Sequence, residues 1–445
     1  MKSHSRIISR RSFLQTTALA GLAFPFVSRL GAVSANGIIN HASFGATGMA
    51  SSDLNAIMDT KLANLIAVAE VDLRRTEELK QKYPGVKVYQ DWRELLDKEA
   101  KNIESVNIST PDHMHGAMAM AALQAGKHVY GQKPLTQNVF ESRQVTLQAR
   151  KSKVVTQMGI QVHSSVQYRL PALLIKDGAI GKVKEVHTWS SKMWGDMEPK
   201  PNRVDPIPAG FNWDMWLGVA TERSYLDRYY HPGNWRKRLD FGTGTFGDMG
   251  CHIYDPVFKA LALTAPLSIR SEGPAPNDYN WAINAVIHYV FPGTPYTDGK
   301  TVRVTWYDGE KRPPQNIQNL LGDIKLPEQG SIFIGTKGVM LLPHVGRPQL
   351  LPVANYQGYE YPELPPLNHW KQYLEAIRGN DKASANFDYA GALTETVLLG
   401  GVATRFPNQT LVWNLEKLEF RNVKEANQYL RREYRKGWEP KWIKV

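Results

Sequence analysis

The sequence predicts an α/β fold in two parts: an N-terminal Rossmann domain built on a parallel sheet, and a C-terminal α+β domain with a mainly antiparallel sheet. Short apolar runs alternate with helical segments over residues 36–160, as in parallel strands joined by helices. A turn of small residues, 45–50, follows the first apolar run. Beyond residue 160, apolar and polar residues alternate with a period of two, as in half-buried strands.

Length and composition agree with two domains preceded by a leader. The chain has 445 residues, too many for one ordinary domain, and 42% of them are hydrophobic. We divide it into a leader (1–35), the Rossmann domain (36–160) and the C-terminal domain (161–445). The formal net charge is +12, but the leader contributes five basic residues and no acid, and no dense Lys/Arg run follows it. Nucleic acid is therefore not an expected partner.

The leader has the parts of a signal peptide. A basic start, S-R-R-S-F-L-Q at 9–15, precedes an apolar stretch at 16–27 and small residues that end at Ala35. The paired Arg10 and Arg11 resemble the twin-arginine export signal. That resemblance implies the twin-arginine export machinery as a partner, a periplasmic location and a cofactor loaded before export. The alternative is a basic helix on the membrane surface.

The Rossmann domain should begin with a strand at 37–44 and a glycine-containing turn. Two registers of the dinucleotide motif fit: one sets positions 43, 45 and 48 on its glycines, and the other sets positions 45, 47 and 50 there. We prefer the second, because it ends the strand at Phe44 and begins the helix near the N-cap residues 51–53. The turn residues expected to contact a dinucleotide cofactor are Gly45, Thr47, Gly48 and Met49.

The next predicted strand, 65–69, ends at an acidic residue. Glu70 lies about twenty residues beyond the glycine turn, the spacing at which an acid binds the adenosine ribose hydroxyls. This residue favours NAD as the cofactor. Arg74 and Arg75 keep NADP possible, because an arginine there can hold a 2′-phosphate.

A strand–helix–strand unit spans 105–134 and places polar residues after each strand. Ligands bind at the carboxyl ends of parallel strands. S-T-P at 109–111 and G-Q-K-P at 131–134 follow the two strands, so both are candidate ligand contacts, and Lys133 is the residue on which the site is built. The unit is predicted as a strand at 106–108, a helix at 116–125 ended by Gly126, and a strand at 127–130.

With these motifs the chain resembles the Gfo/Idh/MocA oxidoreductases, named for glucose-fructose oxidoreductase and inositol dehydrogenase. The family usually has Glu-Lys-Pro where this chain has Gln-Lys-Pro. The resemblance implies an NAD(P)-dependent oxidoreductase and looks closest to the exported, sugar-acting branch. It places Ser109, Thr110, Pro111, His115, Gln132 and Lys133 at the cofactor, and its further motifs lie at 159–161, 178–183, 213–218 and 242–252.

Asp248 and His252 are the candidate partners of Lys133. They lie four residues apart in a helix predicted at 246–261, so both project from one face. A lysine, an aspartate and a histidine around one carbon suit alcohol oxidation: one group removes the hydroxyl proton, and the others orient the alcohol and stabilise charge while hydride leaves to the nicotinamide. The alternative is Asp248 as a helix cap and His252 as a buried core histidine.

Gln132 departs from the family pattern. An amide keeps the length and hydrogen-bonding ability of glutamate but loses its charge, and a carboxylate beside Lys133 would stabilise the ammonium form. The change therefore favours Lys133 as a base, or indicates that the nicotinamide is held differently.

A metal site is not expected. His113, His115, Asp248, Cys251 and His252 are residue types that bind metals, but their spacing matches no known zinc pattern. Cys251 is the only cysteine, so the chain forms no internal disulfide.

The C-terminal domain should supply the substrate contacts and, through its sheet, the interface of a homo-oligomer. Aromatic rings stack on the C–H faces of sugars, and arginine or histidine can bond their hydroxyls; the candidates are Gln161, His163, Trp213, Tyr230, Trp235 and Arg236. Strands are predicted at 183–189, 281–291 and 301–307, a hairpin at 330–342, and helices at 369–378 and 393–404 that pack on this sheet.

The sequence thus predicts an exported NAD(P)-dependent oxidoreductase that acts on a hydroxyl of a sugar, glycoside or cyclitol and keeps its cofactor bound. One alternative is an NAD-dependent glycoside-cleaving enzyme that works through a transient keto-sugar. The other is a non-catalytic sugar-binding protein on a decayed dehydrogenase fold. Joint retention of Lys133, Asp248 and His252 argues against the second alternative.

Overall fold

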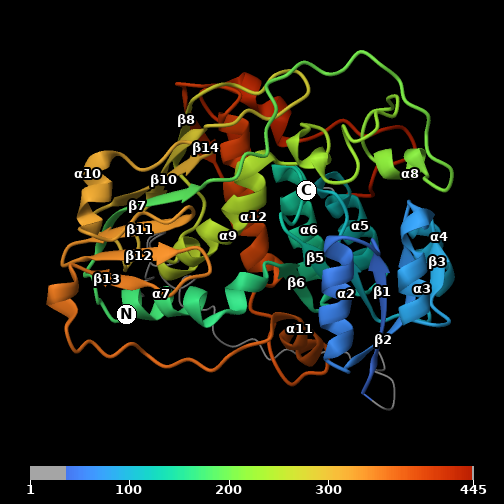
Figure 1. Ribbon diagram of the computed structural model, residues 1–445, viewed down its shortest axis with the longest axis horizontal. Coiled ribbons are helices and arrows are strands. Elements are labelled where there is room, and N and C mark those ends of the chain that lie inside the picture. The colour runs from blue at the N-terminus through green and yellow to red at the C-terminus, as the bar shows by residue number, and fades with distance from the viewer. Residues whose placement is uncertain (1–36, 443–445) are drawn as a thin grey trace, which may run out of the picture. The chain divides into compact units, whose positions relative to one another are not determined.

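The N-terminal half of the structure is a six-stranded parallel sheet. The computed structural model describes residues 37–442, so the predicted leader lies outside the described residues. The strand order is β3-β2-β1-β4-β5-β6, and helices flank the sheet (Figure 1). The order reverses between β1 and β4, where open parallel sheets bind their ligands. The predicted Rossmann fold is confirmed, with β1 (Ile39–Phe44), β2 (Ala63–Ala69), β3 (Lys87–Tyr89), β4 (Ser105–Ile108), β5 (His128–Gln132) and β6 (Thr156–Gly159).

The helix after β1 begins earlier than the sequence predicts. α2 (Met49–Asp59) starts directly after Gly48, whose backbone lies at φ 63° and ψ −125°. Glycine adopts this conformation without steric cost, so the helix begins at Met49 without a side-chain cap. The predicted N-cap at residues 51–53 is wrong, and Asp53 becomes a buried residue inside the helix.

The helix after β4 also starts early. α5 (Asp112–Gln124) begins directly after Pro111, four residues before the predicted start. Pro111 has φ −59°, a value that suits the entry to a helix. Its first turns therefore contain His113 and His115, which the sequence analysis placed before the helix. Gly126 ends α5 at φ 71°, as predicted. The other helices here are α3 (Glu77–Lys82), α4 (Trp92–Glu99) and α6 (Val139–Ser152).

The C-terminal half holds a nine-stranded sheet with the order β13-β12-β11-β7-β10-β9-β8-β14-β15. Its ladders are antiparallel except for the pair β7–β10, so the predicted α+β domain is confirmed. The strand predicted at 281–291 starts only at Val286. The strands are β7 (Val183–Ser190), β8 (Ser268–Glu272), β9 (Val286–Pro292), β10 (Thr301–Asp308), β11 (Gly330–Gly335), β12 (Val339–Pro343), β13 (Gln349–Leu351), β14 (Thr410–Asn414) and β15 (Glu419–Phe420).

The helix predicted at 369–378 packs on the other half of the molecule. In α11 (His369–Ile377), Tyr373 and Leu374 share a buried cluster with Ile39 of β1 and Leu54 of α2. The expectation that this helix covers the antiparallel sheet is wrong, because its apolar face completes the core of the parallel sheet instead. The C-terminal part of the chain thereby returns to the Rossmann half.

α12 (Phe387–Ala403) joins the two halves, since it packs against α6, α9 (Gly244–Ala260) and β8. It begins six residues before the predicted start because the side chain of Asn386 accepts hydrogen bonds from the amides of Asp388 and Tyr389. Such a cap typically stabilises a helix by about 1 kcal/mol. The other helices of this half are α7 (Val166–Lys176), α8 (Trp213–Leu217) and α10 (Gln315–Gln318).

A long segment between β7 and α9 crosses to the Rossmann half, and we call residues 207–231 the strap. The amide of Leu73 donates to the carbonyl of Gly210 at 3.0 Å, and the amide of Asn212 donates to Val71 O at 2.8 Å. These bonds fasten the strap beside the end of β2. Aromatic residues of the strap form a buried cluster together with two residues that follow it. The members are Phe211, Trp213, Trp216, Tyr225, Tyr229, Tyr230, Trp235 and Phe241.

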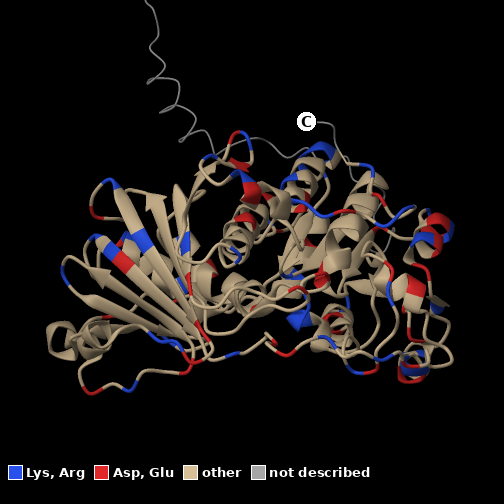
Figure 2. Cartoon of the chain, turned by 90° about the horizontal axis from the view of Figure 1, so that it is seen from above, with Lys and Arg blue, Asp and Glu red and all other residues tan. Residues whose placement is uncertain are grey.

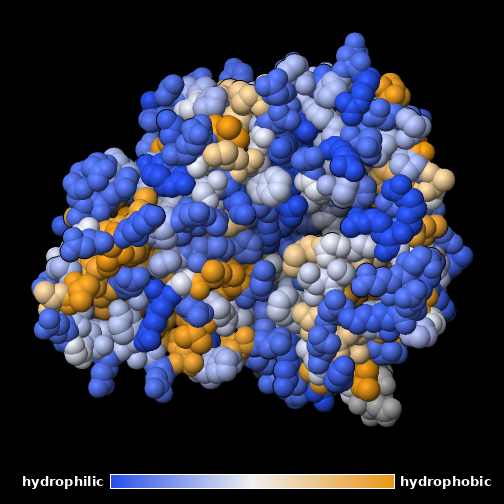
Figure 3. Space-filling model, viewed as in Figure 1, coloured by the Kyte–Doolittle hydropathy of each residue, from blue (hydrophilic) through white to orange (hydrophobic). Residues whose placement is uncertain are grey.

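Charged residues of both signs are spread over the helices and loops of the chain (Figure 2). Apolar side chains gather on the left of the face in Figure 3, the side on which β10 to β13 lie in Figure 1. Among residues 37–442, no helix combines the length and the apolar character needed to span a bilayer.

Candidate active site

Lys133 lies directly after β5, at the carboxyl edge of the parallel sheet. Its ammonium group reaches α9, where Nζ lies 2.5 Å from Asp248 Oδ1 and 3.1 Å from the Asp248 carbonyl oxygen. The two side chains are only 11% and 12% exposed. The fold thus brings together two candidate residues that are 115 positions apart in the sequence.

Arg236 completes this ion-pair group. Its Nε donates to Asp248 Oδ1 at 3.1 Å, while its guanidinium lies over the rings of Trp235 and Trp194, at 4.4 and 5.6 Å from their centroids. Burial opposes ionisation of Asp248, but the charges of Lys133 and Arg236 outweigh it and hold the pKa of this carboxyl well below its usual range. Asp248 is therefore a permanent carboxylate, suited to orient Lys133 and unsuited to donate a proton.

His252 follows Asp248 by one helical turn, as predicted. It is 8% exposed, and its Nδ1 is buried without a hydrogen-bond partner in the described part of the chain. Burial and the charge of Lys133 lower the pKa of His252 well below its ordinary value. A neutral imidazole next to Lys133 can accept a proton or a hydrogen bond from a substrate hydroxyl.

Sequence reasoning missed His344 and Tyr168. His344 lies in the turn after β12, its Nδ1 is hydrogen-bonded to the Tyr168 hydroxyl of α7, and its ring centroid lies 6.0 Å from that of His252. Burial and the charges of Lys192 and Lys133 lower the pKa of His344 to about 4. The one available signal was a histidine directly after the predicted hairpin, which by itself suggests a surface turn.

The glycine turn after β1 leaves room for a ligand. Gly45 has φ 97°, and a Cβ there would lie 2.6 Å from the carbonyl oxygen of Ser109, so only glycine fits. A Cβ at Gly48, also at positive φ, would meet only Arg75 Nη2 among the described residues, at 3.9 Å. The turns after β1 and β4 therefore adjoin at the point where the strand order reverses, and these residues fit a dinucleotide phosphate. Thr110 is half-buried, and Met49 is 40% exposed.

Glu70 supports this turn from the end of β2. Its carboxylate accepts hydrogen bonds from the amide of Ala46 at 3.1 Å, the hydroxyl of Thr47 at 3.3 Å and the amide of Asp72 at 3.1 Å. Burial raises the pKa of Glu70, and the two amides oppose that rise. The residue predicted to bind the ribose thus also fixes the loop that would carry the phosphates.

The two arginines after Glu70 differ in their surroundings. Arg74 is held by Asp72 through two 2.7 Å bonds. Arg75 instead lies over the glycine turn, with Nη2 3.9 Å from where a Cβ on Gly48 would be. Arg75 is therefore the arginine placed near a 2′-phosphate.

Gln132, the departure from the family pattern, is bonded to a buried carboxylate. Its Nε2 donates to Asp53 Oδ2 at 2.8 Å. The same carboxylate accepts from the Ser109 hydroxyl at 2.7 Å and the indole of Trp370 at 3.1 Å. Burial raises the pKa of Asp53, while its three donors oppose the rise. Asp53 on α2 thus places a carboxylate beside Gln132.

His115 ties the two ligand turns together. Its Nδ1 lies 2.7 Å from the carbonyl of Pro134, and its Nε2 lies 2.8 Å from the carbonyl of Thr110. Both nitrogens face carbonyl oxygens, so a ring N–H can donate to the turn that it faces. The structure gives His115 a positioning role for the turns after β4 and β5; a direct contact with the cofactor stays a prediction.

The predicted substrate residues fall into two groups. Arg236 contacts Asp248 and lies over the ring of Trp235, whereas Trp213 and Tyr230 of the strap pack inside the aromatic cluster, at 7% and 1% exposure. Contact of Trp213 and Tyr230 with the substrate stays a prediction, and packing in the cluster accounts for their position.

Gln161 and His163 lie in the short turn after β6. His163 is buried between Asp255, at 2.7 Å from Nδ1, and Lys259, at 3.0 Å from Nε2.

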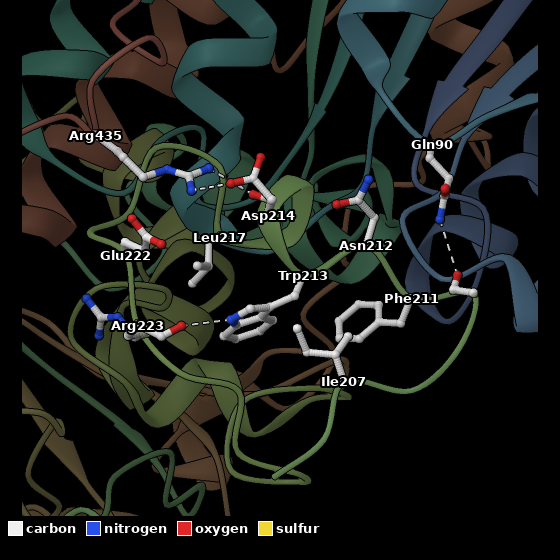
Figure 4. A pocket seen from close by; sticks show the side chains of 11 residues that line it. Gln90, Ile207, Phe211, Asn212, Trp213, Asp214, Leu217, Glu222, Arg223 and Arg435 are labelled. Carbon is white, nitrogen blue, oxygen red and sulfur yellow. Dashed lines mark hydrogen bonds and ion pairs between the residues drawn. The ribbon is translucent and has the colours of Figure 1, made fainter. Parts of the chain in front are cut away.

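The structure contains a pocket beside the strap and a second pocket beside α9. Figure 4 shows the first, of about 460 Å³, with Phe211, Trp213 and Gln90 on its wall and Asp214 bound to Arg435. The second, of about 340 Å³, is lined by residues of α6, α9 and α12. Neither pocket is lined by Lys133, Asp248 or His252. We therefore assign the candidate active site from the ion-pair group and not from a pocket.

Metal-binding residue types do not converge in the structure. Within residues 37–442, no group of three His, Cys, Asp or Glu side chains is arranged to hold a metal ion. His113 Nε2 faces the carbonyl of Trp216 at 3.0 Å, and Cys251 is buried in α9.

Two domains of one protein family match the chain in order. The oxidoreductase family with an NAD-binding Rossmann fold matches residues 39–160, and its C-terminal alpha/beta domain matches residues 180–440. Together these matches cover most of the sequence and correspond to the two sheets described above.

The relatives with known names are dehydrogenases. Levoglucosan dehydrogenase of Pseudarthrobacter phenanthrenivorans is 28% identical over 232 residues, 52% of this chain and 47% of that protein. Myo-inositol 2-dehydrogenase of Thermotoga maritima is 28% identical over 206 residues, 45% of this chain and 59% of that protein. The chain thus spans about half the length of the curated relatives it matches.

Solved structures share the fold. The WlbA dehydrogenase of Bordetella pertussis, crystallised with NADH and UDP-GlcNAcA, matches 85% of this chain and 99% of its own with a TM-score of 0.60 at 13% identity. An aldose-aldose oxidoreductase of Caulobacter crescentus matches 84% and 100% with a TM-score of 0.55 at 14% identity. The matched domains and the shared architecture lead to one conclusion: this chain belongs to the Gfo/Idh/MocA oxidoreductases and carries their NAD-binding domain.

Proposed function

We propose that this protein is an exported NAD-dependent oxidoreductase that acts on a hydroxyl of a sugar, glycoside or cyclitol. The observation that carries the proposal is the buried group of Lys133, Asp248 and Arg236 beside a neutral His252, at the carboxyl end of β5. The named relatives that act on levoglucosan and myo-inositol support the substrate class.

The chain's own residues divide the work of alcohol oxidation. NAD, when bound, accepts the hydride. Asp248 orients the Lys133 side chain, which can take the hydroxyl proton when its amine is in the neutral form. Arg236 and the permanent carboxylate fix the electrostatic environment, and we assign the neutral imidazole of His252 to binding the substrate hydroxyl. This complete arrangement argues against a decayed, non-catalytic protein.

We further propose that the cofactor stays bound through the reaction cycle. The periplasm is not expected to hold a pool of NAD, so an exported dehydrogenase that released NADH would work once. The strap supports slow release, because its bonds to Val71 and Leu73 fasten it beside Glu70. Protein purified without added nucleotide should carry close to one dinucleotide per chain. An empty protein whose activity depends on added NAD would contradict retention, while the dehydrogenase activity itself would stand.

Export rests on the leader. Changing Arg10 and Arg11 together to lysine should leave the precursor in the cytoplasm, because the twin-arginine pair is what the resemblance identifies as the signal. Immunoblots of periplasmic and cytoplasmic fractions measure this, with Arg6→Lys as a control in the same leader. Normal export of the double variant would contradict the proposal that Arg10 and Arg11 direct export.

Nucleotide choice should favour NAD, because a 2′-phosphate would meet the Glu70 carboxylate. Glu70→Ser should weaken binding of both nucleotides by loosening the turn, and should narrow the NAD preference by roughly tenfold, or ~1.4 kcal/mol. Titration of dinucleotide-free protein by calorimetry measures both affinities. Arg75→Ala is the matched control and should weaken NADP more than NAD. Equal affinities in the unmodified protein would contradict the role given to Glu70.

Self-association through the C-terminal sheet is a further proposal. Along β9, Val286, His288 and Val290 alternate with buried residues and remain half-exposed on one face. Such a face suits contact with a second copy, and the oligomeric state stays a prediction.

A further inference from the structure

The pocket of about 340 Å³ beside α9 lies outside the group of residues assigned to alcohol oxidation. The first turns of α6 and α9 and the last turns of α12 line it, together with Trp281. Its wall also carries three arginines, Arg405, Arg431 and Arg432, and we call it the arginine pocket. Because guanidinium groups bind carboxylates and phosphates, a concave site with several arginines suits an anionic ligand.

Arg405, directly after α12, carries a half-buried charge without an acidic partner. Its guanidinium lies 4.3 Å from the ring centroid of Tyr429 and 5.4 Å from that of Trp281. Within residues 37–442, no carboxylate forms an ion pair with it. Burial lowers the pKa of Arg405, and Tyr429 and Asp240 oppose that change. Aromatic rings attract a cation but do not neutralise it, so the pocket holds a partly desolvated positive charge.

Arg432 is the second half-buried arginine of the pocket. Its Nη1 donates to Gln137 Oε1 at 3.0 Å, and its Nη2 donates to the carbonyl oxygen of Asp240 at 3.3 Å. Both acceptors are neutral, and the buried Nε has no hydrogen-bond partner in the described part of the chain. Burial raises the pKa of Glu141 and the charge of Arg432 opposes that rise, but the two side chains form no ion pair. A buried donor without an acceptor is costly, so this N–H is a ready contact for an anion.

The acids on the pocket wall do not neutralise these two arginines. Asp240 is paired with Arg223, and its side chain is 47% exposed. Asp278 and Glu433 are exposed, so solvent and salt screen their charges. The half-buried charges on the wall are therefore positive, whereas the negative charges are paired elsewhere or lie in water.

We propose that the arginine pocket binds a small oxyanion, either the carboxylate of a sugar acid or a phosphate group, through Arg405 and Arg432. A planar guanidinium can donate two parallel hydrogen bonds to either group, and such charge-assisted bonds are stronger than neutral ones. The unpartnered Nε of Arg432 supplies one donor, and the guanidinium of Arg405 supplies others. This site is independent of the proposed oxidation, because it uses no residue of the Lys133 group.

Calorimetric titration at fixed ionic strength tests the site with two probes, inorganic phosphate and glucuronate. Saturating NAD keeps the dinucleotide site occupied during the titration. The unmodified protein should bind at least one probe, and Arg405→Gln and Arg432→Gln should each weaken that binding by roughly tenfold, because each removes charge-assisted hydrogen bonds. Tighter binding of glucuronate identifies a sugar acid as the source of the oxyanion, and tighter binding of phosphate identifies a phosphate group; either order supports the site.

Arg93→Gln is the matched control and should bind the probe with unchanged affinity. The Arg93 guanidinium also lies over an aromatic ring, 4.0 Å from the centroid of Trp438, but it is paired with Asp91 at 2.7 Å. Arg405→Lys keeps the charge without the planar fork, so its affinity should lie between those of the unmodified protein and Arg405→Gln. The probe should also raise the melting temperature of the unmodified protein more than that of Arg405→Gln. Binding of neither probe, or an affinity that both glutamine variants share with the unmodified protein, would overturn the proposal.

Discussion

Lys133→Ala is expected to slow oxidation of the substrate hydroxyl by a factor on the order of 10²–10⁴, the usual contribution of a general base. The variant removes the side chain that links the end of β5 to Asp248, while Arg236 still neutralises that carboxylate. The fold should therefore persist. Single-turnover formation of NADH in substrate-saturated protein measures the chemical step directly.

The matched control for this variant is Lys98→Ala. Lys98 lies on α4 and pairs with Glu94 on the surface, where an ion pair contributes little to stability. It should leave the rate unchanged. His252→Ala should cost a comparable factor to Lys133→Ala, because it removes the free imidazole beside the lysine. Unchanged turnover in either catalytic variant would remove that residue from the mechanism.

Gln132→Glu, which restores the usual family motif, is expected to destabilise this protein strongly. The new carboxylate would face Asp53 at the place where Gln132 Nε2 now donates across 2.8 Å. Two buried carboxylates at this distance cannot both ionise without a large cost. Introducing an uncompensated buried charge typically costs about 3–5 kcal/mol. Urea denaturation at pH 8 should show a loss of this size.

The pH dependence of that loss identifies its cause. Burial already raises the pKa of Asp53, and a second acid raises it further. A carboxyl whose pKa is higher in the folded than in the unfolded state favours folding at low pH, and this contribution is lost as the pH rises through the folded value. The destabilisation by Gln132→Glu should therefore be smaller at pH 5 than at pH 8.

A double variant tests whether the charge has been exchanged between α2 and β5. Asp53→Asn with Gln132→Glu keeps one carboxylate and one amide in the pair, so it should recover most of the stability lost in Gln132→Glu alone. Asp53→Asn alone serves as the matched single variant. A double variant no more stable than Gln132→Glu would show that the two side chains are not coupled, and the account of the altered motif would be wrong.

Local patterns were sufficient to predict β1, β2, β4 and β5 of the parallel sheet and the shared face of Asp248 and His252 in one helix, whereas their association with Lys133 came from the family resemblance. Apolar runs between turn residues define strands, and a four-residue spacing in a helix fixes which side chains share a face. Helix starts were less predictable. At Gly48 and Pro111 the backbone itself begins the helix, so the polar residues that looked like caps or loop residues lie within it.

Contacts between distant elements could not be read from the sequence. His344 belongs to the site only because the turn after β12 packs beside α7 and α9. Asp53 bonds Gln132 across the sheet edge, although each residue alone looks ordinary. Trp213 and Tyr230 have the chemistry of sugar contacts, but the strap needs its own apolar core, and that core holds them. Side-chain type therefore indicated the chemistry, while tertiary packing decided which residues surround Lys133.

The most direct test of the account follows one hydride. Protein purified without added nucleotide is freed of small molecules by gel filtration. It is then mixed with a glucoside that carries deuterium on the carbon to be oxidised. The bound dinucleotide is released, and its mass is measured by mass spectrometry. The account predicts a dinucleotide one mass unit heavier than NADH in the unmodified protein, and none in Lys133→Ala. NADH that lacks deuterium at every quench time of a single turnover, from protein that still converts the glucoside, would contradict the claim that this site passes hydride from a sugar carbon to a retained NAD.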